Sequence, residues 1–165
     1  MHAAQPAAEA VTESRKFLVV VDQTPECDNA MRYAARRAAK TASGVILLFV
    51  VARPEFQQFA GIEQRMREEA HAEAQQVLRE LATRLKSDTG IEAELVVREG
   101  TPAQEILKLV SEDAAIHVLV LAAGSGKDGP GPLVSSFSGQ LAGTTPIPVT
   151  IVPGHLDLGQ VDRIA

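Results

Sequence analysis

The stretch Phe17-Leu-Val-Val-Val-Asp22 decides the fold that the sequence predicts. A continuous run of β-branched and other apolar residues is typical of a central parallel strand that is covered on both faces. An Ala-rich segment follows from about Cys27 to Thr41, and Ala30, Ala34 and Ala38 share one stripe at helical spacing. A buried strand followed by an amphipathic helix is the repeating unit of an α/β sheet.

The same alternation continues to the end of the chain. Further buried strands are predicted at 45–51, 91–97, 116–121 and 146–152. Helices are predicted at about 62–86, from Thr101-Pro102 through Val110, and at about 133–141. We therefore expect an α/β fold, an open five-stranded parallel sheet sandwiched by about four helices, with right-handed crossovers.

Length and composition indicate one domain. The chain has 165 residues, of which 45% are apolar, enough to bury a core without disulfides. The domain is expected to cover 15–153, after a leader at 1–14 and before a polar tail at 154–165. No apolar stretch approaches the roughly 20 residues that cross a bilayer, so we expect a soluble protein.

Charge and cysteine content limit the partners and the compartment. The net charge of −5 comes from 16 basic and 21 acidic side chains scattered along the chain, which argues against nucleic acid or an anionic membrane as the main partner. Cys27 is the single cysteine, so an intrachain disulfide is impossible and a reducing cytoplasm is expected. The four histidines lack the spacing of a metal pair, so no metal site is expected.

Two loops are candidates for a ligand site. In open α/β sheets ligands bind beyond the carboxyl ends of the strands, where the strand order reverses. Asp22 to Asp28 follows the first predicted strand, and the Gly-rich segment Ala122 to Ser136 follows the fourth. Backbone N–H groups in such a strand-to-helix loop can hold an anion.

Familiar catalytic motifs do not fit the Gly-rich segment. A P-loop requires Ser or Thr after Gly-Lys, whereas Gly126-Lys127 is followed by Asp128. Ser125 lacks the outer glycines of a nucleophile elbow. Three glycines have the spacing of a dinucleotide fingerprint, but they follow the fourth strand instead of the first. The sequence therefore names no catalytic residue.

From Arg15 to Pro153 the chain resembles the universal stress protein family. The resemblance rests on short motifs after successive strands: Asp22 and Thr24 with Ala30, Val50-Val51, Gly100-Thr-Pro-Ala with Ile106, and Pro146-Ile-Pro-Val. It implies an adenine nucleotide alpha hydrolase-like fold, with Asp22, Thr24 and Val51 beside the adenine and ribose and the loop after the fourth strand on the phosphates. It also implies a homodimer paired through the last strand, at Val149, Ile151 and Val152.

The phosphate loop departs from the family pattern Gly-x2-Gly-x9-Gly-Ser/Thr. An ungapped register places Ala122, Ser125 and Ser135 on the three glycines and Ser136 on the hydroxyl position. A Cβ restricts positive φ and close approach of backbone to phosphate, and Pro130 and Pro132 cannot donate an N–H. Further candidate phosphate contacts are Gly124, Gly126 and Lys127, together with the hydroxyls of Ser135 and Ser136.

Three hypotheses follow from these patterns. The first is a stress-response sensor that weakly binds ATP or AMP with Mg²⁺, neither of which the fold requires. The second is a nucleotide-independent dimeric interaction module with a degenerate phosphate loop, whose protein partner the sequence does not identify. The third is a slow ATP or phosphate-ester hydrolase on the same fold.

Overall fold

The computed structural model describes residues 14–53 and 60–165, and it confirms the predicted α/β fold. The parallel strands have the order β3-β2-β1-β4-β5. The strands are β1 (Lys16–Val20), β2 (Gly44–Val51), β3 (Glu94–Glu99), β4 (Ile116–Ala123) and β5 (Val149–Pro153). The helices are α1 (Cys27–Thr41), α2 (Ala60–Thr89), α3 (Pro102–Glu112), α4 (Pro132–Ser138) and α5 (Leu158–Ile164).

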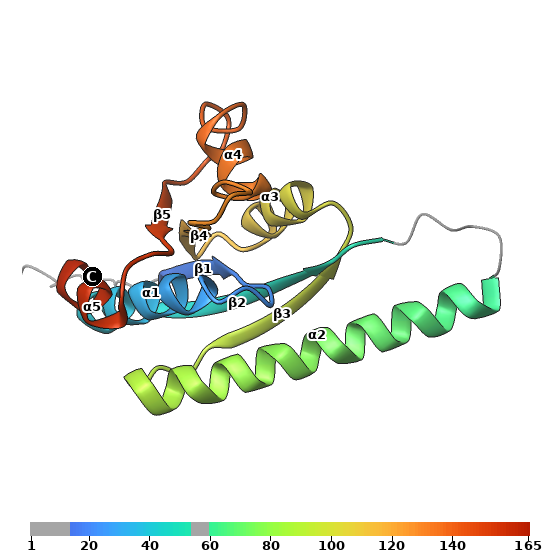
Figure 1. Ribbon diagram of the computed structural model, residues 1–165, viewed down its shortest axis with the longest axis horizontal. Helices are drawn as coiled ribbons and strands as arrows, with labels where there is room; N and C mark the ends of the chain where they lie inside the picture. The colour runs from blue at the N-terminus through green and yellow to red at the C-terminus, as the bar shows by residue number, and fades with distance from the viewer. Residues whose placement is uncertain (1–13, 54–59) are drawn as a thin grey trace, which may run out of the picture.

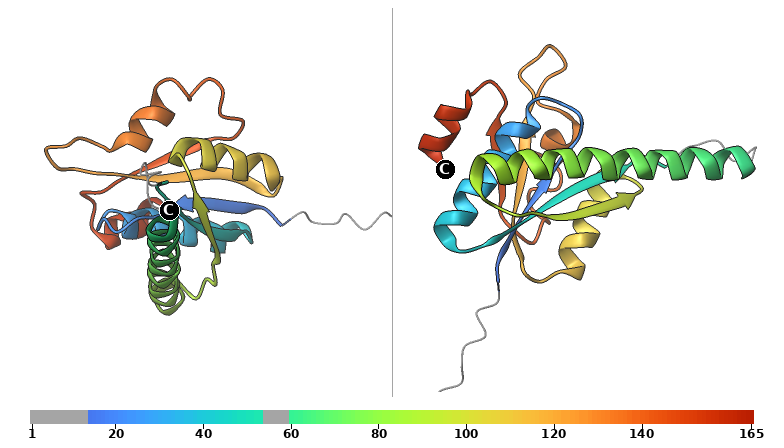
Figure 2. Two further views of the ribbon diagram at one scale, coloured as in Figure 1. Left: turned by 90° about the vertical axis from the view of Figure 1, so that its right-hand side faces the viewer. Right: turned by 90° about the horizontal axis from the view of Figure 1, so that it is seen from below.

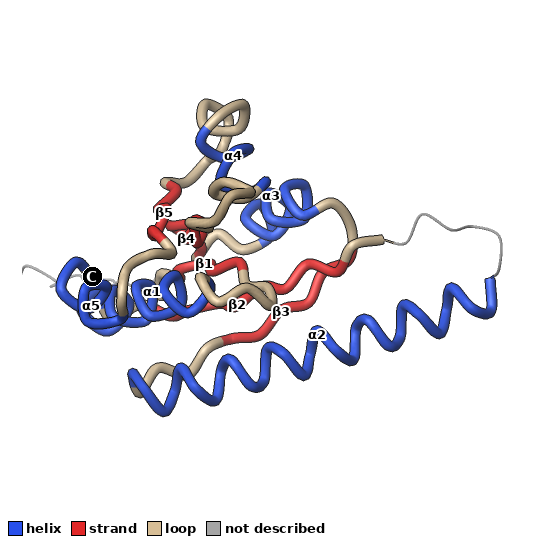
Figure 3. Tube along the Cα trace, in the orientation of Figure 1, coloured by secondary structure: helices blue, strands red, loops and turns tan. Residues whose placement is uncertain are grey.

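The sheet lies between two helical layers, as Figures 1 and 3 show. One face packs against α1 and α2, and the other packs against α3 and α4. Each face of the sheet has its own hydrophobic core, the first with α1 and α2 and the second with α3 and α4. Val19 of β1 packs in the first core and its neighbour Leu18 in the second, and both are fully buried. Burial on both faces explains why β1 is continuously apolar from Phe17 to Val20.

The polar tail predicted at 154–165 contains a helix, α5, which lies beside α1 (Figure 2). It begins with a capping box in which the Asp157 side chain accepts from the Gln160 backbone N–H and the Gln160 side chain accepts in return. Val161 is buried, and Arg32 and Arg36 on α1 both bind Asp162.

Hydrogen bonds connect the entry of α5 to α1. The Asn29 side-chain amide donates to the backbone oxygens of Pro153, at 3.0 Å, and Leu156, at 2.9 Å. The hydrogen bond from Arg32 and the further bond from Arg36 keep the pKa of Asp162 well below its ordinary value. The segment after β5 is therefore folded and packed against α1.

Two strands begin three residues later than predicted. β3 begins at Glu94, three residues after the expected start at 91, and β5 begins at Val149 instead of 146. In the second case Pro146 and Pro148 delay the strand, because proline cannot donate to the hydrogen-bond ladder.

The first turns of α2 extend past the sheet (Figure 1). With 30 residues, α2 is about 45 Å long, whereas the eight residues of β2 span about 26 Å. Ile62 and Met66 are consequently 60% and 52% exposed, while Ala74 and the apolar residues after it on the packed face are buried.

A charged cluster attaches this extended part of α2 to β3. Glu99 Oε2 lies 2.9 Å from His71 Nε2, and Glu99 Oε1 lies 3.0 Å from Arg67 Nη2. The hydrogen bonds from His71 and Arg67 lower the pKa of Glu99.

Among the helices of the described ranges, none is long and apolar enough to span a membrane.

Candidate functional site

A cleft of about 180 Å³ lies at the carboxyl ends of β1 and β4. These strands are adjacent although the chain visits β2 and β3 between them, so the cleft occupies the point where strand order reverses. Its walls come from the β1–α1 loop, the end of β4 and the start of α4. The lining residues are Val20, Asp22, Thr24, Glu26, Cys27, Leu121, Ala122, Pro130, Gly131, Pro132, Leu133 and Val134.

The Asp22 carboxylate organises the loop on one side of the cleft. Its Oδ1 accepts hydrogen bonds from the Thr24 backbone N–H at 2.7 Å, from the Thr24 hydroxyl, and from the Cys27 thiol at 3.0 Å. This is an Asx turn, a local structure that aspartate forms readily. One carboxylate oxygen is therefore committed to the loop itself.

Cys27 begins α1 directly beneath this turn and is buried. Burial, and secondly the hydrogen bond to Asp22, raises the pKa of the thiol to about 12. The thiol is therefore protonated at neutral pH. Because the thiolate is the nucleophilic form of cysteine, Cys27 is a structural donor in this site and not a reactive group.

The loop after β4 uses two of its backbone N–H groups in internal hydrogen bonds. Gly124 N–H donates to the Pro130 carbonyl at 3.1 Å, and Gly129 N–H donates to the Gly126 carbonyl at 3.2 Å. Gly124 also permits a close approach, because a Cβ there would lie 3.1 Å from Gly129 O and 3.2 Å from Glu26 Oε1. An N–H group that is already paired inside the loop cannot donate to a phosphate oxygen, and a proline has no N–H to donate.

The charge of the cleft also disfavours an anion. Asp22 and Glu26 contribute two carboxylates, and the described residues that line the cleft include no lysine or arginine. Like charges at short range repel, most strongly where solvent is partly excluded. Glu26 was not among the predicted site residues, although its position in the β1–α1 loop was a visible signal.

The structure brings together only some of the predicted nucleotide contacts. Asp22, Thr24 and Ala122 line the cleft. Val51 is buried and its carbonyl accepts from Gly100 N–H at 2.9 Å. The rest lie outside the lining: Gly124 is half-buried, Ser125, Gly126 and Lys127 are exposed, and Ser135 and Ser136 lie within α4.

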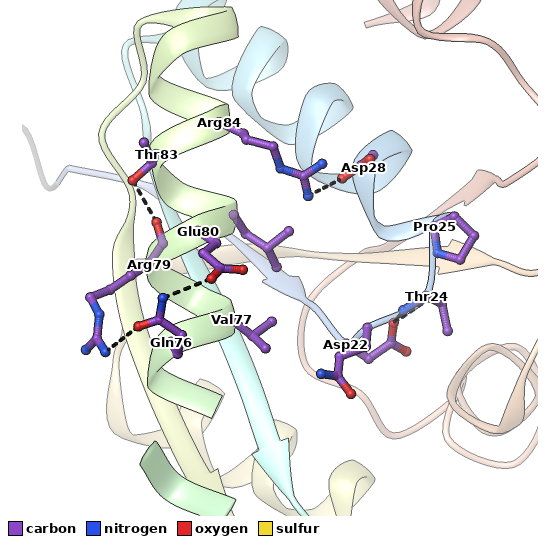
Figure 4. Close-up of a pocket in the computed structure, with 12 residues that line it drawn as sticks. Asp22, Thr24, Pro25, Asp28, Gln76, Val77, Arg79, Glu80, Thr83 and Arg84 are labelled. Carbon is purple, nitrogen blue, oxygen red and sulfur yellow. Dashed lines mark hydrogen bonds and ion pairs between the residues drawn. The ribbon is translucent and has the colours of Figure 1, made fainter. Parts of the chain in front are cut away.

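A larger groove, of about 790 Å³, lies on the other side of the β1–α1 loop (Figure 4). Its second wall is α2, which was predicted as a helix but not as part of a site. The lining residues are Asp22, Gln23, Thr24, Pro25, Asp28, Gln76, Val77, Arg79, Glu80, Leu81, Thr83 and Arg84. Asp22 and Thr24 therefore face both hollows. The polar face of α2 from Gln76 to Arg84 was the signal available in the sequence.

Comparison with known structures shows the same fold. UspA from Lactobacillus plantarum is 18% identical, with a TM-score of 0.70 over 84% of this chain and 97% of that one. A universal stress protein solved in complex with cAMP is 20% identical, with a TM-score of 0.63 over 86% of this chain and 98% of that one. The universal stress protein from Archaeoglobus fulgidus in complex with dAMP is 17% identical, with a TM-score of 0.59 over 84% and 97%.

Sequence comparison gives the family directly. None of the curated proteins matches this sequence significantly. The sequence profile of the Universal stress protein family matches residues 13–153, which include all five strands and the helices α1 to α4. The chain therefore belongs to the universal stress protein family.

Proposed function

We propose that this protein is a nucleotide-independent, non-catalytic interaction module of the stress response, and that it acts in the cytoplasm. The observation that carries the proposal is the small, acidic, proline-lined cleft at the carboxyl ends of β1 and β4. Ligand pockets for small molecules usually enclose about 300–1,000 Å³, and this cleft, at about 180 Å³, is smaller than that range.

The chemistry of the cleft supports this choice over catalysis. Its thiol is protonated, and its aspartate is engaged by Thr24 and Cys27. A catalytic site needs a nucleophile, a base and a stabiliser for developing negative charge, and the carboxylates of Asp22 and Glu26 would oppose that last role.

Calorimetric titration with ATP and Mg²⁺, and separately with AMP, tests the proposal. We expect no saturable heat up to millimolar nucleotide, because the cleft is small and its lining holds two carboxylates and no lysine or arginine. Glu26→Gln serves as the diagnostic variant, since it removes one of the two repelling charges without changing side-chain size. Saturable binding by the unmodified protein that disappears in Asp22→Ala would contradict the proposal.

Weak adenine-nucleotide binding is the second candidate function. Saturable nucleotide binding by the unmodified protein that disappears in Asp22→Ala would establish it. Two observations favour it: Asp22, Thr24 and Ala122 share one cleft, and relatives of the same fold were crystallised with cAMP and dAMP. Under this hypothesis AMP, with one phosphate, binds at least as well as ATP, because each added phosphate meets the same acidic wall.

We further propose a homodimer paired through β5. β5 lies at the edge of the sheet, so within the described chain its outer side has no neighbouring strand. Of the residues predicted for the interface, Ile151 is 37% exposed, Val149 is half-buried and Val152 points into the core. Ile151 therefore supplies the apolar contact, and the flanking Pro146, Pro148 and Pro153 limit further strand addition.

An Ile151→Lys variant is expected to be monomeric at concentrations where the unmodified protein is a dimer, because two lysines would meet across a symmetric strand pair. Sedimentation equilibrium measures the mass. Leu95→Lys is the matched control, since Leu95 is 38% exposed on β3, at the opposite edge of the sheet. A monomeric unmodified protein, or dissociation by Leu95→Lys alone, would refute pairing through β5.

A further inference from the structure

The groove between the β1–α1 loop and α2 is crossed by a polar contact near each end. Arg84 Nη2 on α2 lies 3.2 Å from Asp28 Oδ1, and Gln23 Nε2 donates to Glu73 Oε1 on α2 at 3.3 Å. Glu73 and Arg84 are eleven residues apart, or about 16 Å along the helix. The two contacts therefore enclose a hollow of small-molecule length.

The groove lining has one more negative than positive charge, since the carboxylates of Asp22, Asp28 and Glu80 stand against the guanidinium groups of Arg79 and Arg84. Arg84 is paired with Asp28, while the Arg79 guanidinium bonds Gln76 and points away from the β1–α1 loop (Figure 4). Glu80 lies on the α2 wall, where its carboxylate accepts a hydrogen bond from Gln76, while Asp22 lies on the loop opposite (Figure 4). Within the described chain, Asp22 and Glu80 each accept hydrogen bonds through one carboxylate oxygen, which leaves Asp22 Oδ2 and Glu80 Oε2 for a ligand.

Apolar surface lies between these carboxylates. Val77 is half-buried and points into the groove, and Pro25 lies on the opposite wall (Figure 4). Leu81 is buried and also lines the groove. A matching ligand would therefore carry a positive charge at each end of a flexible hydrocarbon chain. Its charged ends would meet carboxylates on opposite walls, and its methylene groups would cover Val77 and Leu81.

We propose that this groove binds an aliphatic diamine or polyamine. The volume of about 790 Å³ falls in the range of small-molecule sites, and the contacts at both ends favour a short linear ligand over a continuous peptide. The site shares Asp22 and Thr24 with the cleft between β1 and β4, but its second wall is α2 and its ligand has the opposite charge to a nucleotide. Failure of either proposal leaves the other standing.

Calorimetric titration of the full chain with spermidine tests the inference, and 1,6-hexanediol is the uncharged control. We expect saturable binding of spermidine that weakens as salt is raised, and no saturable binding of the diol. Glu80→Gln and Asp22→Asn should each weaken spermidine binding about tenfold, the loss of one charge-assisted hydrogen bond at a partly exposed site. Asparagine keeps an acceptor for the Asx turn, so the loop is retained.

Glu69→Gln is the matched control variant, because it makes the same charge change on an exposed part of α2 outside the groove lining. It should bind spermidine like the unmodified protein. Equal losses in Glu69→Gln and Glu80→Gln would show diffuse attraction to an acidic surface and overturn the inference. Absence of saturable heat with spermidine, in protein whose circular dichroism is native, would overturn it as well.

Discussion

An Asn29→Asp variant is expected to unfold with a free energy about 3–5 kcal/mol below that of the unmodified protein, the usual cost of an uncompensated buried charge. Asn29 is 6% exposed, and its amide donates to two backbone oxygens, those of Pro153 and Leu156. A carboxylate in the same place has nothing to donate and would face both oxygens. The resulting repulsion between oxygens would act on the segment that connects β5 to α5.

The free energy of unfolding that is lost in Asn29→Asp should depend on pH. Burial next to two carbonyl oxygens favours the protonated form of the new aspartate, so its pKa in the folded state is raised above the unfolded value of about 3.9. The deficit is therefore full at neutral pH and narrows as the pH falls through the raised pKa. Urea unfolding at several pH values measures it.

Asn29→Ala is the control for this variant, because it removes the donor without adding charge. We expect it to cost about 1–3 kcal/mol, for the carbonyl oxygens left without a partner, and to show no added pH dependence. If Asn29→Asp matched Asn29→Ala at every pH, the new carboxylate would have to be solvated, and the position of Asn29 described above would be wrong.

Phe137→Ala is expected to lower the free energy of unfolding by about 3–5 kcal/mol, the range for removing a buried phenylalanine. Phe137 is 2% exposed and packs with residues of α3 and β4 in the second core. α4 has seven residues, too few to be stable alone, so Val134 and Phe137 hold it on the sheet. Denaturant unfolding measures the loss.

Leu158→Ala is a suitable comparison for Phe137→Ala. Leu158 begins α5 and is among the exposed large apolar residues, so its truncation should change stability by about 0.5 kcal/mol or less. A loss below about 1 kcal/mol in Phe137→Ala would mean that α4 is not docked as described. The wall that α4 gives to the β1–β4 cleft would then also be misplaced.

The regular elements were predictable because burial leaves a periodic trace in the sequence. β1 required an apolar residue at every position after Lys16, and α1 required alanines at helical spacing where it crosses the sheet, so α1 begins and ends where the pattern predicted. α5 was missed because it has only seven residues and lies in a segment predicted as a polar tail, although Leu158, Val161 and Ile164 recur at three-residue steps. Asp157 and Gln160, three residues apart, were a capping signal that could have revealed it.

The contents of the candidate sites were less predictable, since they depend on contacts between distant segments. The sequence showed that prolines replace donors after β4, and the structure adds that Gly124 and Gly129 use their N–H groups inside that loop. Periodicity could not show that Glu26 faces the same cleft, or that Glu80 of α2 lines one groove with the loop after β1. Such pairings come from the packing of helices on the sheet.

The extension of α2 past the sheet has a consequence for local unfolding. Backbone amides exchange their hydrogens with solvent according to the free energy of the opening that exposes them, and that energy is low where few side chains are buried. The turns around Ile62 and Met66 are held to the domain mainly through the charged cluster at Glu99, whereas the turns from Ala74 to Leu85 are packed on the sheet. One continuous helix thus contains a segment that frays readily and a segment that opens only when the domain unfolds, and the proposed polyamine groove is built on the second.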